Sequence, residues 1–170
     1  MICCVTGHRP NGFPFFRRED DVVYSAYKNM LNEEINKLIN EGYLHFITGM
    51  ADGADIDFAN VVLSYRNEMP WICIEAAMPY PYLIKNKENL NGDHKAKILS
   101  ECDSIHIVSP YYHKGFMQKR NQYMVDKSDL ILAIWNGEKK GGTWNTIKYA
   151  QGIGKRIRYI MLDNIKSDHY

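Results

Sequence analysis

Short runs of apolar residues alternate along the chain with longer segments in which apolar residues recur at helical spacing. Continuous apolar runs of strand length are typical of strands that are buried on both faces of a sheet. We expect six such strands, at residues 2–6, 44–48, 71–77, 104–108, 130–135 and 156–162. The helical spacing predicts helices at residues 20–41, 53–65, 119–127 and 143–152, and a polar loop over 85–97 that enters a further helix ending near Cys102.

This alternation predicts an α/β fold, a single three-layer α/β/α Rossmann-like domain with a mostly parallel sheet. The chain has 170 residues and is 45% hydrophobic, which suits one substantial core and is short for two. We therefore expect residues 1–170 to form one domain. In such a sheet, ligands bind beyond the carboxyl ends of the strands, so the loops at that edge are the candidate site.

One of these loops runs from a buried strand through a glycine turn directly into a helix, over residues 47–59. The first turn of a helix has N–H groups without intrahelical partners, and the helix dipole favours an anion there, so the loop predicts a phosphate site. Acidic residues also cap such helices, which is the alternative for Asp52 and Asp55, although Asp55 would also suit a ribose hydroxyl. No further convergent ligand accompanies them, so we expect no metal. The candidate ligand-binding residues are Gly49, Ala51, Asp52, Gly53 and Asp55.

Two further loops have a similar character. After the first strand, Arg9 is suited to a bidentate contact with phosphate or carboxylate and His8 to hydrogen bonding or titration; the alternative is a surface loop with a capping Thr. Residues 141–146 repeat the phosphate-binding pattern of glycines and hydroxyls, the alternative being a glycine turn with a Thr or Asn cap. The candidates in these loops are Thr6, Gly7, His8, Arg9, Gly141, Gly142, Thr143, Asn145 and Thr146.

The segment 111–122 combines aromatic residues with cations. Arg120 and Asn121 belong to a predicted helix, and we expect their side chains to point into the same crevice as the other loops. Aromatic rings can stack on a nucleotide base. The candidates for stacking are Tyr80, Tyr112 and Trp144.

Composition limits the classes of partner. The 21 basic and 20 acidic residues give a formal charge of +1, so no global field favours nucleic acid or an anionic membrane. The four cysteines form no CxxC pair and no zinc spacing, and we expect buried free thiols. There is no leader pattern and no apolar stretch of membrane-spanning length. We expect a soluble protein of a reducing cytoplasm without membrane contact.

Taken together, these loops resemble motifs of the SLOG superfamily, and within it most closely those of the YpsA-like branch. They are also similar to motifs in the Rossmann-like domain of DprA, a single-strand DNA binding protein. The resemblance implies a Rossmann-like fold that binds nucleotides or nucleotide-derived ligands, often in stress or signalling roles, and commonly a homo-oligomer. The motifs are Thr6-Gly7-His8-Arg9-Pro10, Thr48-Gly49-Met50-Ala51-Asp52-Gly53-Ala54-Asp55, Arg120-Asn121 and Gly142-Thr143-Trp144-Asn145-Thr146 with Ala150.

The LOG branch of the same superfamily implies an enzyme that hydrolyses the N-glycosidic bond of nucleoside 5′-monophosphates with an Arg and a Glu. Arg120 matches the Arg, but Ile147-Lys148-Tyr149 stands where the Glu is expected. A carboxylate near the developing positive charge assists this cleavage, and a Lys opposes it. Asp55 and Glu138 are then the alternatives for a relocated acid, and Asp55 and Arg120 are the catalytic candidates. The sequence leaves open whether the protein is an enzyme.

We therefore expect a cytoplasmic protein that binds a nucleotide-type ligand of the AMP, NAD or ADP-ribose class, with a possible sensor role. Two alternatives remain. One is a LOG-like phosphoribohydrolase, and the other is a DprA-like module that binds single-stranded DNA through local cations such as Lys114, Lys119, Arg120, Lys139 and Lys140. The near-zero net charge argues against the second.

Overall fold

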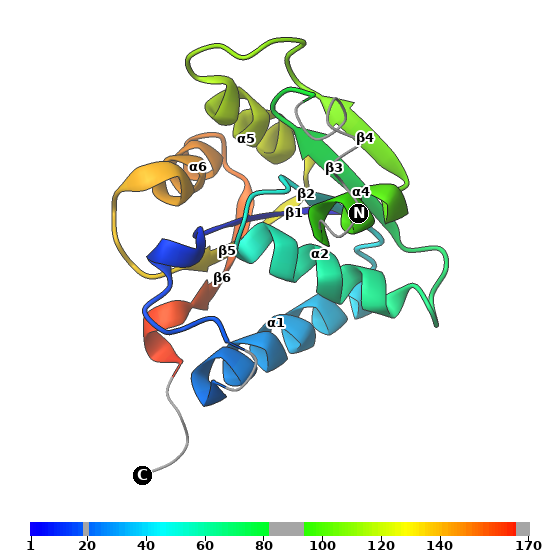
Figure 1. Ribbon diagram of the computed structural model, residues 1–170, viewed down its shortest axis with the longest axis vertical. Helices are drawn as coiled ribbons and strands as arrows, with labels where there is room; N and C mark the ends of the chain where they lie inside the picture. The colour runs from blue at the N-terminus through cyan, green and yellow to red at the C-terminus, as the bar shows by residue number, and fades with distance from the viewer. Residues whose placement is uncertain (19–20, 82–93, 166–170) are drawn as a thin grey trace.

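The computed structural model describes residues 1–18, 21–81 and 94–165, and it contains one six-stranded sheet with helices on both faces (Figure 1). The strands are β1 (Ile2–Gly7), β2 (His45–Thr48), β3 (Cys73–Met78), β4 (Ser104–Ile107), β5 (Leu130–Trp135) and β6 (Arg156–Met161). The α-helices of the described residues are α1 (Val22–Asn40), α2 (Ala54–Tyr65), α4 (His94–Glu101), α5 (Phe116–Lys127) and α6 (Gly141–Gly152). Short 3-10 helices lie at η1 (Pro10–Gly12) and η3 (Leu162–Asn164).

All neighbouring strands are parallel, and their order is β4-β3-β2-β1-β5-β6. From β1 the chain adds β2, β3 and β4 on one side, and then crosses to add β5 and β6 on the other. The direction of winding therefore reverses between β1 and β5. In an open parallel sheet, the loops that leave the two central strands diverge at this point and form a crevice for ligands.

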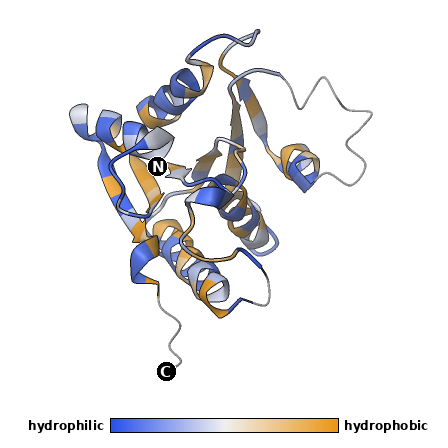
Figure 2. Cartoon of the chain, turned by 60° about the vertical axis from the view of Figure 1, so that its left-hand side comes forward, coloured by the Kyte–Doolittle hydropathy of each residue, from blue (hydrophilic) through white to orange (hydrophobic). Residues whose placement is uncertain are grey.

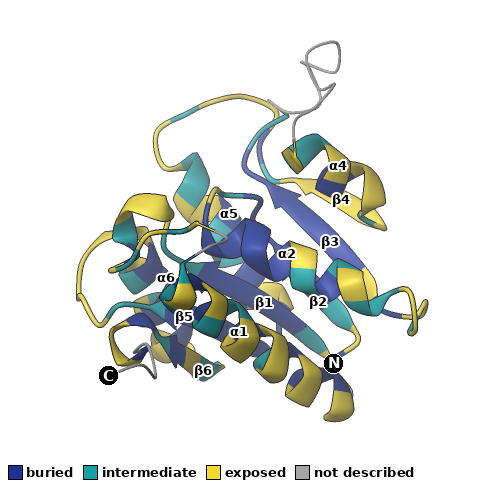
Figure 3. Ribbon diagram, turned by 60° about the horizontal axis from the view of Figure 1, so that its bottom comes forward, coloured by how far each residue is buried: buried dark blue, intermediate teal, exposed yellow. Residues whose placement is uncertain are grey.

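The sheet is the middle of three layers, as the alternation of elements predicts. Along β1, Cys3 and Val5 contact the hydrophobic core that α1, α2 and α4 cover, whereas Cys4 contacts the smaller core under α5 and α6. The central strands are apolar along most of their length (Figure 2) and are buried, while the outer side of α1 and the edge strand β4 are exposed (Figure 3). This confirms the three-layer Rossmann-like fold.

The predicted elements are all found, with differences at their ends. Helix α5 begins at Phe116 instead of residue 119, because Gly115 at a φ of 86° turns the chain into it. Helix α6 begins at Gly141, two residues before the predicted start. Residues 85–93 of the predicted polar loop lie outside the described residues, and residues 94–97 belong to α4 instead of a loop.

The prediction that the thiols are buried holds for two of the four cysteines. All four cysteines are free, and Cys3 and Cys4 are buried, but Cys73 at the start of β3 is exposed and Cys102 is half-buried. The apolar run before β3 is longer than the strand, which begins two residues after Trp71. Among residues 1–18, 21–81 and 94–165, none of the helices combines the length and the apolar character needed to cross a membrane.

Candidate functional site

Three loops and the start of α5 meet in a hollow of about 280 Å³ at the carboxyl ends of β1 and β5, which we call the central hollow. The loop after β1, the first turn of α2, the first turns of α5 and the first turn of α6 each contribute to its wall. Most of the predicted site residues are brought together here. Its lining consists of Val5, Thr6, Gly7, His8, Arg9, Gly12, Ala51, Asp55, Met117, Arg120, Asn121, Gly142 and Thr143.

A second hollow of about 260 Å³ adjoins the first, and we call it the amide hollow. The two share Met117, Asn121 and Gly142. Predicted residues Asn145 and Thr146 line the amide hollow together with Gln118, Gln122, Gly115 and Tyr149. The sequence analysis did not single out Met117, Gln118 and Gln122. Met117 lies three residues before Arg120 and four before Asn121, and Gln118 lies three before Asn121 and four before Gln122, so helical spacing places these pairs side by side.

Asp52 and Gly53 do not lie at either hollow, and this corrects their predicted role. Gly53, at a φ of 96°, turns the chain into α2, and Asp52 extends away to form an ion pair with Lys95 at 2.7 Å. Both residues line a third hollow on the far side of the loop after β1. Gly49 and Gly141 line neither the central nor the amide hollow. Gly49 leaves the space that Arg120 and Asp55 fill, and Gly141, at a φ of 79°, turns the chain into α6.

The N-terminus of α2 is already occupied by groups of the chain itself. The amide of Ala54 donates a hydrogen bond to the carbonyl of His8 at 3.1 Å, and the amide of Ala51 donates to Oδ2 of Asp55 at 3.2 Å. A side chain at Gly53 would collide with the backbone of His8 and Arg9. Gly53 and Asp55 therefore stabilise the turn itself. The carboxyl group of Asp55 occupies the position where the sequence predicted a phosphate.

Arg120 is buried, with 4% of its surface exposed, and it donates hydrogen bonds both to the backbone and to a side chain. Its Nη1 donates to the carbonyls of Gly49 and, at 3.4 Å, Ala77, and its Nε donates to Oδ1 of Asn121 at 2.8 Å. Burial raises the pKa of Asp55, and the charge of Arg120 opposes that rise. Arg120 therefore holds β2, β3 and the Asp55 carboxyl group together, and it is not one of the surface cations that the DNA-binding alternative requires.

Asn121 continues this chain of hydrogen bonds to α6. Its Nδ2 donates to Oγ1 of Thr146 at 2.9 Å, and that hydroxyl donates to the carbonyl of Gly142 at 2.9 Å. The predicted Arg-Asn pair thus connects the carboxyl ends of two strands with the first turn of α6. The arrangement fixes the position of that turn beside the central hollow.

The first turn of α6 is open where that of α2 is filled. Lys140 precedes the helix without a side-chain cap, and Gly141 has a φ of 79°. An added Cβ at Gly141 or Gly142 would meet no atom within 4 Å. The first amides of a helix lack intrahelical acceptors. Gly142 and Thr143 of this turn line the central hollow, so N–H donors and the positive end of the helix dipole lie at its wall.

Arg9 and His8, from the loop after β1, also line the central hollow. Arg9 is exposed, and its charge lowers the pKa of Asp55 less strongly than that of Arg120 does. Burial lowers the pKa of His8, while a hydrogen bond with Asn136 and the charge of Glu138 oppose that change. Nε2 of His8 is buried and has no hydrogen-bond partner among the described residues.

The aromatic rings that the sequence offered for base stacking pack against other rings. Trp144 stacks on Trp135 with centroids 5.5 Å apart, and Tyr80 and Tyr112 form a cluster with Phe116. None of the three candidate rings lines the central or the amide hollow. Within the described part of the chain, no group of three or more His, Cys, Asp or Glu side chains could hold a metal ion.

The chain matches a known protein family over nearly its whole length. The model of the YpsA family, described as the YspA SLOG family, matches residues 3–167. A UPF0398 protein of Bacillus pumilus (strain SAFR-032) is 25% identical over 169 residues, which cover 98% of this chain and 90% of that protein. The UPF0398 protein YpsA of Bacillus subtilis (strain 168) is 23% identical over 159 residues, covering 92% of this chain and 86% of that protein. The chain therefore belongs to the YpsA family of SLOG proteins.

Proposed function

We propose that the chain binds a nucleotide or nucleotide-derived ligand whose phosphate lies against the N-terminus of α6. The observation that carries this proposal is the open first turn of that helix, where no side chain caps the amides and Gly142 leaves space for close approach. Backbone N–H groups and the helix dipole together bind phosphate without needing many cations. The hydroxyl of Thr143 lines the same hollow and adds a further hydrogen-bonding group.

Arg9 is the cation that we assign to the phosphate. Its guanidinium is exposed at the wall of the central hollow, and a guanidinium can bind a phosphate through two parallel hydrogen bonds. Arg120 instead acts as a positioning residue, since its donors are directed at Gly49, Ala77 and Asn121.

The amide hollow suits the uncharged part of such a ligand. Its side chains Gln118, Gln122 and Asn145 each carry both donors and an acceptor, which match the mixed edges of a base or a ribose. The shared residue Gly142 stands between this hollow and the central one, so a ligand with its phosphate at α6 can extend into either.

A charge placed at Gly142 tests the phosphate position. Gly142→Asp sets a carboxylate beside the proposed phosphate, and we expect the affinity for AMP, NAD or ADP-ribose to fall at least about tenfold in calorimetric titration. Gly142→Ala is the matched control, because it adds a Cβ at the same position without the charge. If none of the three ligands binds the wild-type protein, or if Gly142→Asp binds as well as Gly142→Ala, the proposal is wrong.

The variant Arg9→Ala tests whether Arg9 is the cation that binds the phosphate. Arg9→Ala should weaken binding by about 1.5 to 3 kcal/mol, the usual cost of losing a charged hydrogen bond, while the melting temperature of the free protein stays unchanged. Arg156→Ala removes the same charge from an exposed position at the start of β6 and should leave affinity unchanged. Equal affinities of the two variants would show that Arg9 does not contact the ligand.

A second candidate function is hydrolysis of the N-glycosidic bond of a nucleotide, and the position of Asp55 favours it. Asp55 borders the central hollow, and burial raises its pKa against the opposing charge of Arg120. A carboxyl group with a raised pKa can protonate a leaving base as a general acid. We expect a hydrolase to release adenine from AMP and Asp55→Asn to abolish that release. If wild-type protein binds AMP and liquid chromatography detects no adenine, this candidate is excluded and the binding function stands.

A further inference from the structure

Two neighbouring helices each contribute a pair of side chains to the amide hollow. Gln118 and Gln122 stand four residues apart on α5, and Asn145 and Tyr149 stand four residues apart on α6. Residues at this spacing lie side by side on one face of a helix. The hollow is therefore bordered by three carboxamides and one aromatic ring.

The three carboxamides are not occupied by groups of the chain itself. Within the part of the chain that the structure describes, the side chains of Gln118, Gln122 and Asn145 form no hydrogen bond. Asn121 lines the same hollow and differs, because its Oδ1 accepts from Nε of Arg120 and its Nδ2 donates to the hydroxyl of Thr146. Each free carboxamide offers two N–H donors and an acceptor oxygen to a ligand.

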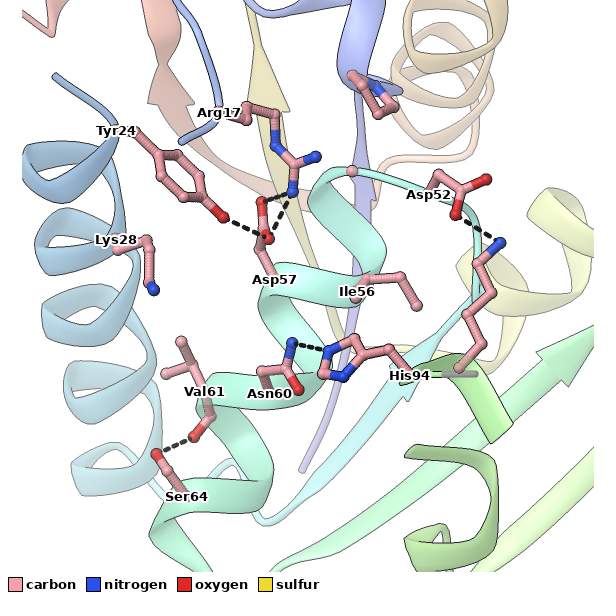
Figure 4. Close-up of a pocket in the computed structure, with 13 residues that line it drawn as sticks. Arg17, Tyr24, Lys28, Asp52, Ile56, Asp57, Asn60, Val61, Ser64 and His94 are labelled. Atoms are coloured by element: carbon pink, nitrogen blue, oxygen red, sulfur yellow. Dashed lines mark hydrogen bonds and ion pairs between the residues drawn. The ribbon is translucent and has the colours of Figure 1, made fainter. Parts of the chain in front are cut away.

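The third hollow has the opposite character (Figure 4). Its volume of about 770 Å³ is larger, but its polar side chains contact one another, as the dashed lines in Figure 4 show. The pairs are Arg17 with Asp57 at 2.6 Å, Asn60 with His94 at 2.9 Å and Lys95 with Asp52 at 2.7 Å. A polar ligand there competes with contacts that the chain already makes, whereas the carboxamides of the amide hollow bind a ligand without such a loss.

Tyr149 gives the amide hollow an aromatic ring in a fixed position. Its hydroxyl donates to Oδ1 of Asp126 of α5 at 2.7 Å, and its ring packs against the smaller core under α5 and α6. Among residues 1–18, 21–81 and 94–165, no other aromatic ring is in contact with it. A ring that is held in this way at the wall of a hollow is suited to stacking on a nucleotide base.

The spacing along α6 matches the length of a mononucleotide. Tyr149 follows Gly142 by seven residues, and an α-helix rises about 1.5 Å per residue, so the two lie about 10 Å apart along the helix axis. This separation is comparable with the length of an extended nucleoside monophosphate. A nucleotide with its phosphate at the first turn of α6 therefore brings its base beside Tyr149.

We propose that the amide hollow binds an adenine base, which stacks on Tyr149. The carboxamides of Gln118, Gln122 and Asn145 bind its polar edge. Adenine presents a donor beside an acceptor, which a carboxamide matches with two hydrogen bonds, whereas guanine is bound best by a cation and cytosine by a carboxylate. None of the described residues that line this hollow is a Lys, Arg, Asp or Glu. The inference rests on the proposed nucleotide function and adds to it the base and the residues that select it.

Calorimetric titration with AMP, GMP and ribose 5-phosphate tests whether the base is bound. We expect AMP to bind at least about fivefold more tightly than GMP, and at least about fivefold more tightly than ribose 5-phosphate, which has the phosphate but no base. If AMP binds no more tightly than either of them, the inference is wrong, while a loss of binding in Gly142→Asp still supports the proposed function. An absence of AMP binding also overturns the inference, and the proposed function fails with it only if NAD and ADP-ribose do not bind either.

Two variants of Tyr149 test the stacking. Tyr149→Ala should lower the affinity for AMP at least about fivefold and leave that for ribose 5-phosphate unchanged, whereas Tyr149→Phe keeps the ring and should keep the affinity for AMP. Tyr159→Ala removes a 40% exposed ring outside the hollow and should have no effect on either ligand. Equal affinities of Tyr149→Ala and the wild-type protein for AMP would overturn the inference.

Gln122→Leu tests the polar edge of the base and does not depend on whether Tyr149→Ala folds. We expect the ratio of the affinities for AMP and GMP to fall toward one, while the affinity for ribose 5-phosphate stays unchanged. Gln151→Leu makes the same change at an exposed position in the last turn of α6, outside the hollow, and should leave the ratio as it is in the wild-type protein. The same ratio in Gln122→Leu and Gln151→Leu would place the base away from the amide hollow.

Discussion

Gly49 has no side chain, and the space that a side chain would need is filled by Arg120 and Asp55. An added Cβ would lie 2.5 Å from Cζ of Arg120 and 2.6 Å from Oδ2 of Asp55, closer than nonbonded atoms approach. Since the guanidinium is buried and hydrogen bonded to the backbone, it cannot move away without losing those bonds. We expect Gly49→Ala to lower the free energy of unfolding by about 2 to 4 kcal/mol in urea denaturation. Gly142→Ala, which meets no atom within 4 Å, is the control and should change it by less than about 1 kcal/mol.

A double-mutant cycle measures how strongly the buried Arg120 and Asp55 are coupled. Arg120→Met leaves the Asp55 carboxyl group buried without its cation, and we expect a loss of about 3 to 5 kcal/mol in the free energy of unfolding. Asp55→Asn keeps the shape of the side chain and removes its charge. The double variant should lose clearly less free energy of unfolding than the two single variants together, because neither partner is then buried without the other. Strictly additive losses would mean that the two groups are not coupled.

Glu75 lies in the first half of β3, away from the carboxyl end of the strand, and makes the stability of the fold depend on pH. Its side chain is 2% exposed, and it accepts hydrogen bonds from the hydroxyl of Tyr123 at 2.6 Å and from Nζ of Lys127 at 2.7 Å. Burial raises the pKa of Glu75, but the hydrogen bonds from Lys127 and Tyr123 outweigh it, so the pKa is lowered from its ordinary value of 4.5.

A carboxyl group with a lowered pKa stabilises the folded state above pH 4.5, and that contribution is lost as the pH falls through the lowered value. We expect Glu75→Gln to cost about 1.5 to 3 kcal/mol near neutral pH and to make the variant less sensitive to acid than the wild-type protein. Urea denaturation at a series of pH values measures both effects. Glu33→Gln, at an exposed position of α1, controls for the loss of one surface charge. Parallel curves for the wild-type protein and Glu75→Gln would contradict this assignment.

Helix α6 packs on the sheet and is also tied to α5 by side-chain hydrogen bonds. Asn121 donates to the hydroxyl of Thr146, which in turn donates to the carbonyl of Gly142. We expect Asn121→Ala to destabilise the fold by about 1 kcal/mol, to speed hydrogen exchange over residues 145–149, and to weaken ligand binding. Asn40→Ala removes the same side chain from the exposed end of α1, where it contacts Asn36 at 3.5 Å, and should have none of these effects. Normal exchange in Asn121→Ala would show that the contact does not hold the helix.

The elements were predictable because their signals are local. Continuous apolar runs mark strands buried on both faces, and helical spacing marks the helices between them. The starts of α5 and α6 were missed by two or three residues because a glycine with positive φ, at 115 or 141, turns the chain before the first apolar position. The loops of the site were also predictable, since parallel strands bring their carboxyl ends to one edge.

The roles of single residues within those loops were less predictable, because they depend on which side chain another element delivers. Gly49 and Gly53 look like glycines that admit a ligand, but Arg120 and the loop after β1 fill the space above them. Asp52 and Asp55 stand three residues apart, and only Asp55 faces the central hollow. The sequence motifs therefore predicted which loops meet in the central hollow, whereas the tertiary contacts decide which of their residues line it.

The proposed ligand binding predicts a link between affinity and pH through His8, which also affects the stability of the whole molecule. Burial lowers the pKa of His8 below its ordinary value of 6.5, so the folded protein binds fewer protons than the unfolded chain below that pH, and its free energy of unfolding decreases as the pH falls. A phosphate bound in the central hollow favours the imidazolium and raises that pKa again. Ligand affinity should therefore increase with acidification in the same interval.

We expect NAD to raise the melting temperature more at about pH 5.5 than at about pH 7.5, because its bridging phosphates keep their charge throughout while His8 gains one. His8→Gln should reduce this difference, and Arg9→Ala should weaken stabilisation by NAD at both pH values without removing the difference. A stabilisation by NAD that is equally large at both pH values in the wild-type protein would place the phosphate away from His8. Binding at the N-terminus of α6 would then have to extend toward the amide hollow instead of the loop after β1.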